Sequence, residues 1–334
     1  MIIDMHTHYM PDEMADGLRA RRAAPWIETT GQGRERIHLP IGSLDFGAQF
    51  TDMTARIDFM DGLGIDRQLL SFPSLFGLDS VAVDQAWPLL RLFNDHVSAL
   101  CARHPDRFTG VASLPMADMD AALEEFRRAR SELGLIGAIL PNNCFMSIEE
   151  AEKLRPLFEL GRELGAHFFI HPGRRPDEVP EDDTEPGKYP FADNVLHRQA
   201  LDVQNKVAGA MTTLLFSDFL DPYPDISVHV ANLGGTLPMV IERMDHSVGL
   251  RTPDAALPSS RARRVHVDCS SLGARSLELA VAIYGADRIM VGTDCPIFRT
   301  DWTLQAITDA RITEDERALI RGGNAAELLR RFEG

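Results

Sequence analysis

Two histidines one residue apart stand near the start of the chain, in the stretch "MIIDMHTHYMPDE". The apolar residues before them predict a short β-strand, and side chains two apart on a strand point to the same face, about 7 Å from each other. His6 and His8 therefore present two imidazoles on one face, which suits a single divalent metal ion. The alternative is a pair of surface histidines, so further ligands must come from elsewhere in the chain.

Further polar residues follow apolar runs later in the chain. His171 ends "HFFIH", Asn232 follows "ISVHVA", and Asp294 follows "RIMVGT". Taken singly, His171 could cap a turn before Pro-Gly and Asp294 could cap the next helix. Taken together, His6, His8, His171 and Asp294 supply three imidazoles and one carboxylate, the ligand types of Zn²⁺ or a similar ion. We therefore predict one divalent metal site.

Eight short apolar runs alternate with longer segments of helical period, and these elements must position the site. The runs lie at 2–5, 68–72, 108–114, 136–140, 167–170, 226–231, 265–268 and 289–292. Apolar strands without alternation are typical of parallel sheets covered on both faces. We predict an α/β fold, a single (β/α)8 TIM barrel of residues 1–334, with reactive groups at the carboxyl ends of its strands. The alternative, a doubly wound open sheet, usually carries a Gly-rich turn after its first strand, where this chain has His-Thr-His.

Two segments are longer than a normal connection between a strand and a helix. Residues 9–52 are polar and rich in Gly, Arg and Pro, and we expect a small N-terminal cap over the barrel mouth. Residues 172–198 are rich in Pro and acidic residues and follow the fifth strand. This composition is also found in disordered loops, but the position at the end of a strand favours an active-site loop.

Composition excludes several classes of protein. The 334 residues carry a formal net charge of −16, which argues against a nucleic-acid partner because phosphate binding needs a basic face. No apolar run is long enough to span a membrane, and no signal peptide is predicted. The four cysteines include no C-x-x-C pair, which favours reduced thiols in a cytoplasmic protein.

The chain resembles the amidohydrolase superfamily, and within it the branch of aminocarboxymuconate-semialdehyde decarboxylase and related aromatic-acid decarboxylases. The stretches that carry the resemblance are "IIDMHTH", "FIHPG", "SDFLDPYPDISVHVANLGGTLP", "MVGTDCP" and "GGNAAELL", and the similarity covers nearly the whole chain. It implies that His6, His8, His171 and Asp294 hold one divalent ion, zinc, with manganese known in close relatives. No Lys ends the fourth strand, "IGAILPNN", so the bridging carbamylated Lys of binuclear relatives has no candidate there.

The chain departs from these relatives after its sixth strand. They carry a His just ahead of the Gly pair, which helps to activate water or orient the substrate, whereas alignment on "GGTLP" puts Asn232 at or next to that position. An amide can only donate and accept hydrogen bonds. His229 lies three residues earlier, on the opposite face by strand period, which favours packing between barrel and helices over a role as substitute base. A bulge could rotate His229 inward, so both roles stay open.

Several arginines are candidates to bind an acidic substrate. Relatives hold a carboxylate with an arginine from the cap, for which the nearby candidates here are Arg34, Arg36 and Arg56. A second set follows the fifth and eighth strands and consists of Arg174, Arg175 and Arg299. An acidic substrate would need cationic partners there, but these residues could equally well be exposed loop arginines without such a role. Asp268, after the seventh strand, could contact substrate or brace a metal ligand.

The resemblance implies a metal-dependent carboxy-lyase that decarboxylates an aromatic or muconate-type acid without oxidation. Asp294 would carry a proton to the carbon that loses CO2, with Asn232 or His229 assisting and the metal acting as template and Lewis acid. The alternative is a metal-dependent hydrolase of an amide, lactone or C–C bond, in which Asp294 accepts a proton from water. A third class is a non-catalytic metal-binding barrel. The expected partner is a small-molecule carboxylate, and such chains often form homodimers.

Overall fold

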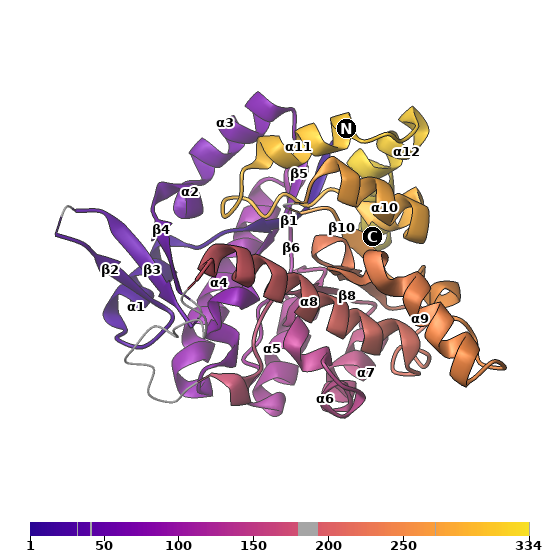
Figure 1. Ribbon diagram of the computed structural model, residues 1–334. Helices are drawn as coiled ribbons and strands as arrows, with labels where there is room; N and C mark the ends of the chain where they lie inside the picture. Colours follow the sequence, from indigo (N-terminus) through magenta and orange to yellow (C-terminus); the bar gives the residue numbers. More distant parts are fainter. Residues whose placement is uncertain (32, 41, 180–192, 271, 334) are drawn as a thin grey trace.

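The eight predicted strands are all present in the computed structural model, which describes residues 1–31, 33–40, 42–179, 193–270 and 272–333 (Figure 1). Their bounds are β1 Ile3–His8, β5 Arg67–Ser71, β6 Phe108–Gly110, β7 Gly137–Pro141, β8 His167–His171, β9 Ser227–Val230, β10 His266–Asp268 and β11 Ile289–Met290. Each overlaps its predicted run, although β1 ends three residues later than predicted and β6 ends four residues earlier.

These strands form a closed parallel ring. β1, β5 and β6 make one parallel sheet, and β7 to β11 make a second, with neighbours paired in chain order. Isolated parallel bridges join the two sheets on both sides, between Asp4 and Val291 and between Ala112 and Ala138. The ring therefore closes, and the predicted (β/α)8 barrel is confirmed.

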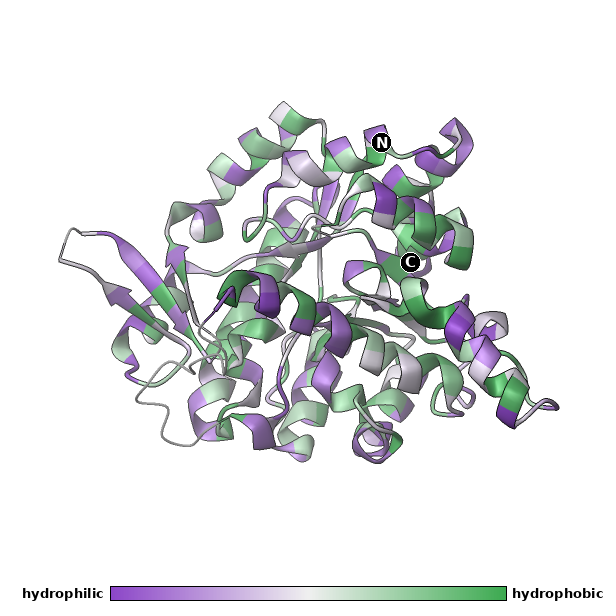
Figure 2. Ribbon diagram, viewed as in Figure 1, coloured by the Kyte–Doolittle hydropathy of each residue, from purple (hydrophilic) through white to green (hydrophobic). Residues whose placement is uncertain are grey.

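Helices surround the ring, as Figure 1 shows. The longer ones are α3 Met53–Leu63, α4 Val83–Arg103, α5 Met119–Ser131, α7 Arg155–Glu163, α8 Val195–Phe216, α9 Leu237–Arg251, α10 Ala274–Tyr284 and α11 Thr300–Asp309. Shorter ones are α6 Ile148–Glu152, α12 Glu314–Ala318 and α13 Asn324–Leu329. Hydrophobic and hydrophilic residues are interleaved along them (Figure 2), as expected for helices with one face on the strands and one in water.

Alternate residues of the strands enter two separate apolar clusters. On β8, Phe168 and Ile170 belong to the large cluster between strands and helices, whereas Phe169 belongs to a smaller cluster inside the ring. By the same period His167 and His171 share the inner face with Phe169. This alternation puts the last residue of β8 at the inside of the barrel mouth.

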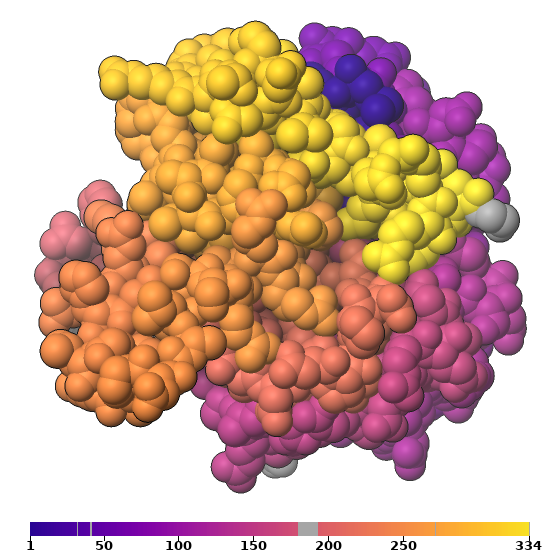
Figure 3. Space-filling view, turned by 90° about the vertical axis from the view of Figure 1, so that its right-hand side faces the viewer, coloured from indigo at the N-terminus to yellow at the C-terminus, as the bar shows by residue number. Residues whose placement is uncertain are grey.

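The C-terminal segment closes the opposite end of the barrel. Ala325, Leu328 and Leu329 join the inner cluster, and the Asn324 side-chain amide donates to the carbonyls of Ala286 and Ile289, both at 2.7 Å. Figure 3 shows the first residues beside this C-terminal segment at the surface. The stretch "GGNAAELL" therefore plugs the barrel floor, which leaves the carboxyl ends of the strands for the site.

The predicted cap contains a helix and a small antiparallel sheet. Its elements within 9–52 are α1 Asp12–Ala20, β2 Trp26–Thr29, β3 Glu35–Leu39, β4 Gly42–Phe46 and α2 Ala48–Thr51, and the sheet projects beside the barrel (Figure 1). In the predicted loop 172–198, residues 180–192 lie outside the described residues. A 3-10 turn covers Pro176–Glu178, and α8 already begins at Val195.

Two expectations from composition can be compared with the described chain. Its four cysteines are all free thiols, namely Cys101, Cys144, Cys269 and Cys295. Among the described residues, no helix combines the length and apolar character needed to cross a membrane.

Candidate metal centre

The four predicted metal ligands meet at the barrel mouth. His6 and His8 lie at the end of β1, His171 ends β8, and Asp294 follows β11. One ligand atom from each lies within 4.8 Å of every other, and all four residues are buried. Asp294 is 8% exposed, the most of the four, so its carboxylate lies on the solvent side of the group.

The three imidazoles are arranged edge to face around a common centre. Ring centroids are 5.1 Å apart for His6 and His8, 4.9 Å for His6 and His171, and 4.8 Å for His8 and His171. The planes of these pairs are inclined by 79°, 75° and 86°. Because the rings are not parallel, one nitrogen of each can point at the same space.

Hydrogen bonds to Nδ1 decide which nitrogen that is. Nδ1 of His171 lies 2.8 Å from the carbonyl oxygen of Pro172, which can only accept, so this Nδ1 carries the hydrogen. Nδ1 of His6 lies 3.0 Å from Oδ2 of Asp268, a carboxylate oxygen that also accepts. In both rings the lone pair is left on Nε2.

His8 also carries its hydrogen on Nδ1, and its partner there is a hydroxyl group. Its Nδ1 lies 3.0 Å from Oγ of Ser71, and that hydroxyl donates its own hydrogen to the carbonyl of Thr7 at 2.9 Å. The Ser71 oxygen must therefore accept from Nδ1 of His8. All three rings thus offer Nε2 as a ligand atom, with the other nitrogen held as in known histidine–metal sites.

Three ligand atoms have no hydrogen-bond partner, although Nε2 of His8 lies 3.1 Å from Oδ1 of Asp294. With His8 protonated on Nδ1, both of these atoms are acceptors and cannot bond to each other. Nε2 of His6, Nε2 of His8 and Oδ1 of Asp294 are buried and make no hydrogen bond. Such atoms are rare in folded proteins because each has lost its contacts with water. A divalent cation would satisfy all three, and three neutral imidazoles with one carboxylate suit it chemically. The residues therefore fit the implied metal ion.

The electrostatics of the group also favour a cation. Burial lowers the pKa of His8 and His171 well below 6.5, which keeps both rings neutral and able to bind a metal. Burial acts in the same direction on His6, but the charges of Asp268 and Asp294 outweigh it and raise the pKa of His6 to about 9. Without a metal ion His6 therefore carries a proton on both nitrogens. A bound cation would displace the proton from Nε2, and the same carboxylates would attract that cation.

The carboxylate of Asp268 accepts hydrogen bonds from His6 and from three other groups. Its fully buried carboxylate accepts from His6, from Nε2 of His229 at 2.8 Å, and from the backbone N–H groups of Asn232 at 3.2 Å and Ser270 at 2.9 Å. Burial would raise the pKa of Asp268, but the His6 charge and the bonds from both histidines outweigh it and lower that pKa. Of its two predicted roles, the structure shows the brace on a metal ligand.

Asn232 presents its amide in one orientation. It follows β9 with a left-handed φ of 58°, and Leu233 follows with 53°, so the chain turns sharply here. Ser270 Oγ donates a hydrogen bond to Asn232 Oδ1. With its acceptor engaged, Asn232 has its NH2 group left to donate.

His229 lies inside the barrel, so the preference for packing between barrel and helices was wrong. Its ring stacks on Phe169, with centroids 4.2 Å apart and planes at 3°, and its Nε2 reaches Asp268. A regular strand period would put His229 on the face opposite Asn232. β9 ends at Val230, and the left-handed turn breaks that period before Asn232.

The arginines after the fifth and eighth strands differ in their partners. Arg175 pairs with Asp177 at 2.8 Å, and Arg299 pairs with Asp301 at 2.5 Å, so both charges are already balanced. Arg174 donates only weakly, to the carbonyls of Glu178 at 3.3 Å and Pro40 at 3.5 Å. Among the described residues, no carboxylate is hydrogen-bonded to Arg174.

Of the three cap candidates, Arg56 reaches the metal ligands. Arg34, just before β3, and Arg36, within β3, are exposed, whereas Arg56 is buried and donates to the His8 carbonyl at 2.6 Å. Arg56 also lines a cavity of about 500 Å³ together with Cys295, Phe298 and Arg299.

Ser71 and Ser270, which orient His8 and Asn232, were not predicted from the sequence. Both follow apolar runs, in "LLS" and "VDCS", so polar residues at strand ends were the signal.

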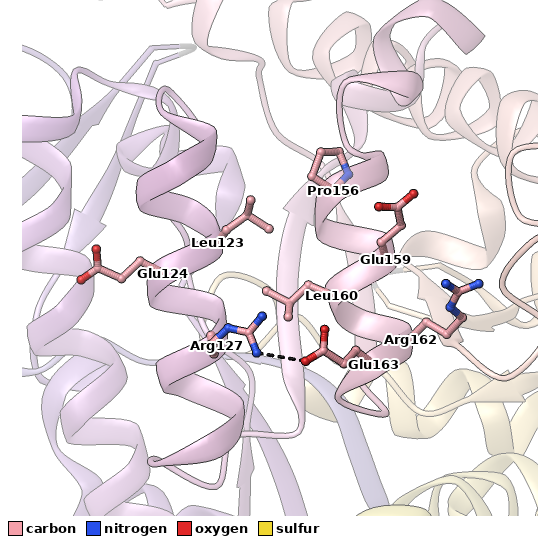
Figure 4. Close-up of a pocket in the computed structure, with 8 residues that line it drawn as sticks. All are labelled: Leu123, Glu124, Arg127, Pro156, Glu159, Leu160, Arg162 and Glu163. Carbon is pink, nitrogen blue, oxygen red and sulfur yellow. Dashed lines mark hydrogen bonds and ion pairs between the residues drawn. The ribbon is translucent and has the colours of Figure 1, made fainter.

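A second cavity, of about 700 Å³, lies on the outside of the barrel between α5 and α7 (Figure 4). Its lining holds no histidine or cysteine and consists of Leu123, Glu124, Arg127, Pro156, Glu159, Leu160, Arg162 and Glu163. Arg127 and Glu163 form an ion pair of 3.1 Å across it. Its size is comparable with an active site, but its chemistry is that of a solvated helix surface.

Known proteins resemble this chain over most of its length. The sequence profile of the family described as Amidohydrolase matches residues 3–331. The 2-amino-3-carboxymuconate-6-semialdehyde decarboxylase of Dictyostelium discoideum is 26% identical over 340 residues, covering 98% of this chain and 91% of the relative. The gamma-resorcylate decarboxylase of Rhizobium radiobacter is 28% identical over 296 residues, covering 82% and 86%.

Solved structures show the same fold. IDCase from Metarhizium anisopliae superimposes with a TM-score of 0.80 at 23% identity, over 100% of this chain and 98% of that one. Dihydroxybenzoic acid decarboxylase from Polaromonas sp. JS666, solved with bound manganese and an inhibitor, gives a TM-score of 0.68 at 20% identity, over 99% and 96%.

Proposed function

We propose that this chain, which belongs to the amidohydrolase family, is a metal-dependent decarboxylase of an aromatic or muconate-type carboxylic acid. The observation that carries the proposal is a set of buried atoms without a hydrogen bond, Nε2 of His6, Nε2 of His8 and Oδ1 of Asp294, which converge with His171 at the barrel mouth. The relatives that match 82% and 98% of the chain are named decarboxylases, which supports decarboxylation over hydrolysis.

The bound ion would supply Lewis acidity and a fixed point for substrate oxygens, and would stabilise the negative charge that develops as CO2 leaves. We assign it as zinc, because three imidazoles and one carboxylate are typical zinc ligands. Manganese is the alternative, since the similar Polaromonas structure holds it. Elemental analysis of protein purified without chelators distinguishes the two ions.

Asp294 is the proposed proton carrier. The C–C bond to the carboxyl group breaks, its electron pair stays on the ring or muconate carbon, and a proton must replace the lost CO2 there. A carboxylate oxygen of Asp294, the most exposed ligand, takes up this proton from solvent water and delivers it to that carbon. Asn232, whose NH2 group is oriented by Ser270, donates a hydrogen bond to a substrate oxygen. An amide neither gains nor loses a proton at neutral pH, so proton transfer falls to Asp294.

Arg174 is our preferred partner for a substrate anion. Arg175 and Arg299, the other proposed substrate-binding residues, already face Asp177 and Asp301. We expect R174A to raise KM by about 10- to 100-fold, because a hydrogen bond between charged groups contributes about 1.5–3 kcal/mol. R299A is the matched control and should change KM by less than about threefold, in line with the small contribution of an exposed pair.

We further propose a cytoplasmic homodimer in which each chain is one barrel domain, 1–334, with the cap at 9–52 and the loop at 172–198. The small antiparallel sheet within 9–52 supports the cap. The acidic composition supports a protein without a nucleic-acid or membrane partner. Light scattering on the purified protein tests the dimer.

The proposed reaction is tested with the metal-loaded enzyme and acids of the two classes, for example 2,6-dihydroxybenzoate and an aminocarboxymuconate semialdehyde. We expect stoichiometric CO2 release that stops when the metal is chelated and returns when zinc is added back. Proton release from amide or lactone substrates without CO2 would instead identify a hydrolase. Full turnover by metal-free protein would contradict the proposal.

A further inference from the structure

His229 shares one carboxylate oxygen with a metal ligand. Its Nε2 lies 2.8 Å from Oδ2 of Asp268, and Nδ1 of His6 lies 3.0 Å from the same oxygen. All three side chains are fully buried, so no water competes for these bonds. The chain of contacts therefore runs from His229 through Asp268 to His6, whose Nε2 faces the metal centre.

The hydrogen-bond pattern sets the tautomer of His229. A carboxylate oxygen only accepts, so His229 carries a hydrogen on Nε2. Its Nδ1 is buried without a partner, and a hydrogen there would be an unsatisfied donor. His229 is therefore the Nε2–H form, the opposite of the three metal ligands. Its only N–H is committed to Asp268, which leaves no proton-transfer role toward a substrate.

The surroundings hold both groups in place. The His229 ring is stacked on the Phe169 ring, with the two centroids 4.2 Å apart. The second oxygen of Asp268, Oδ1, accepts from the backbone N–H groups of Asn232 and Ser270. With both oxygens engaged, the carboxylate cannot rotate away from His6.

We propose that His229 is a positioning residue, which acts through Asp268 to hold the His6 ring with its Nε2 toward the metal ion. The inference rests on the metal-dependent site proposed above, but not on which reaction occurs there. Groups that orient a metal-ligating histidine typically contribute about 10- to 100-fold to metal affinity. His229 adds one link to that arrangement, because it orients the carboxylate that orients the ligand.

The test compares three variants of the full chain. H229L removes the N–H, H229Q keeps an N–H near the position of Nε2, and H167Q changes the neighbouring ring, which is bonded to Ser227 instead. Affinity for Zn²⁺ is measured by competition with a chelator, and the ligand geometry is followed by the visible spectrum of Co²⁺-loaded protein. We expect about 10- to 100-fold weaker binding and a changed spectrum for H229L, recovery to within about threefold for H229Q, and no change for H167Q.

A folded H229L that binds Zn²⁺ as tightly as the parent would overturn the inference, and so would an equal loss in H167Q. Thermal unfolding of the metal-free proteins shows which variants fold. If H229L does not fold, H229N replaces it, because its shorter amide does not reach Asp268, and the same loss is expected. Metal binding is measured without substrate, so an inactive protein with the expected affinities would contradict only the proposed reaction.

Discussion

The barrel contains two groups of buried histidines that differ in what they can bind. His6, His8 and His171 lie at the mouth, and His167 and His229 lie deeper, with β8 carrying a member of each group on the same face. Rings at the mouth are inclined by 75° to 86°, whereas His167 and His229 are stacked at 20°. Stacked rings direct their nitrogens side by side, while inclined rings can direct them to one point.

Burial and residue type do not separate the two groups. Burial lowers the pKa of both His167 and His171 well below 6.5. The differences are the partner of each ring and the nearby carboxylate. Oδ1 of Asp294 lies among the mouth rings without a hydrogen bond, whereas the ring of His229 donates a hydrogen bond to the Asp268 oxygen. A metal site is thus defined by the direction of lone pairs.

The largest expected effect is the loss of a mouth histidine. H171A removes one of four ligands, so we expect metal occupancy to fall to near zero and turnover to be lost. The loss in affinity should exceed the ~10- to 100-fold typical of groups that only support a ligand. Elemental analysis measures it, and H167A, on the same strand, is the control. Unchanged occupancy in H171A would remove His171 from the ligand set.

His167, in the deeper group of histidines, should make the free energy of unfolding depend on pH. Burial first, then the charges of His229, His266 and Arg331, lower the pKa of His167 far below 6.5. A histidine with a lowered folded pKa keeps its full contribution above pH 6.5, and stability is lost as the pH falls through and below that value. The free energy of unfolding of H167Q should therefore rise relative to that of the parent by up to about 1.4 kcal/mol for each pH unit below 6.5. Urea unfolding in buffers between pH 5 and 8 measures this difference. If the free energy of unfolding varies with pH in the same way for both proteins, the prediction is wrong.

The serine partners of the two groups can be compared directly. Ser71 holds Nδ1 of His8, and Ser227 holds Nδ1 of His167 at 2.9 Å. We expect S71A to weaken Zn²⁺ binding by about tenfold, because the His8 ring loses the bond that fixes its tautomer. S227A should leave binding unchanged. Equal effects of the two substitutions on chelator competition would mean that the groups are not distinct.

The smallest effect is expected for Ser270. S270A frees the amide of Asn232 to rotate, and a lost hydrogen bond of about 1 kcal/mol corresponds to about fivefold in KM. Zn²⁺ affinity should not change, since the Ser270 backbone N–H still reaches Asp268. Steady-state kinetics and chelator competition on the same preparation separate the two readouts. A loss of metal without a change in KM would place Ser270 with the metal ligands instead.

Much of the fold and of the metal site could be predicted from local pattern. Eight apolar runs with helical segments between them indicated a barrel, and barrel geometry brings strand ends together whatever their distance in sequence. His6, His8, His171 and Asp294 could be identified because each stands at such an end. The side on which His229 faces could not be predicted, because it depends on where β9 stops and on the left-handed turn at Asn232.

By itself, the sequence determined the strand ends and the types of ligand, since hydrophobic period and residue chemistry are local properties. Only the tertiary structure decided which nitrogen of each ring is free, because that depends on partners from other strands, such as Ser71 for His8 and Asp268 for His6. It also decided that one buried carboxylate serves both His6 and His229, whose positions are 223 residues apart in number (229 minus 6). Hydrogen-bond direction is set by neighbours in space, and the closed ring of strands supplies those neighbours.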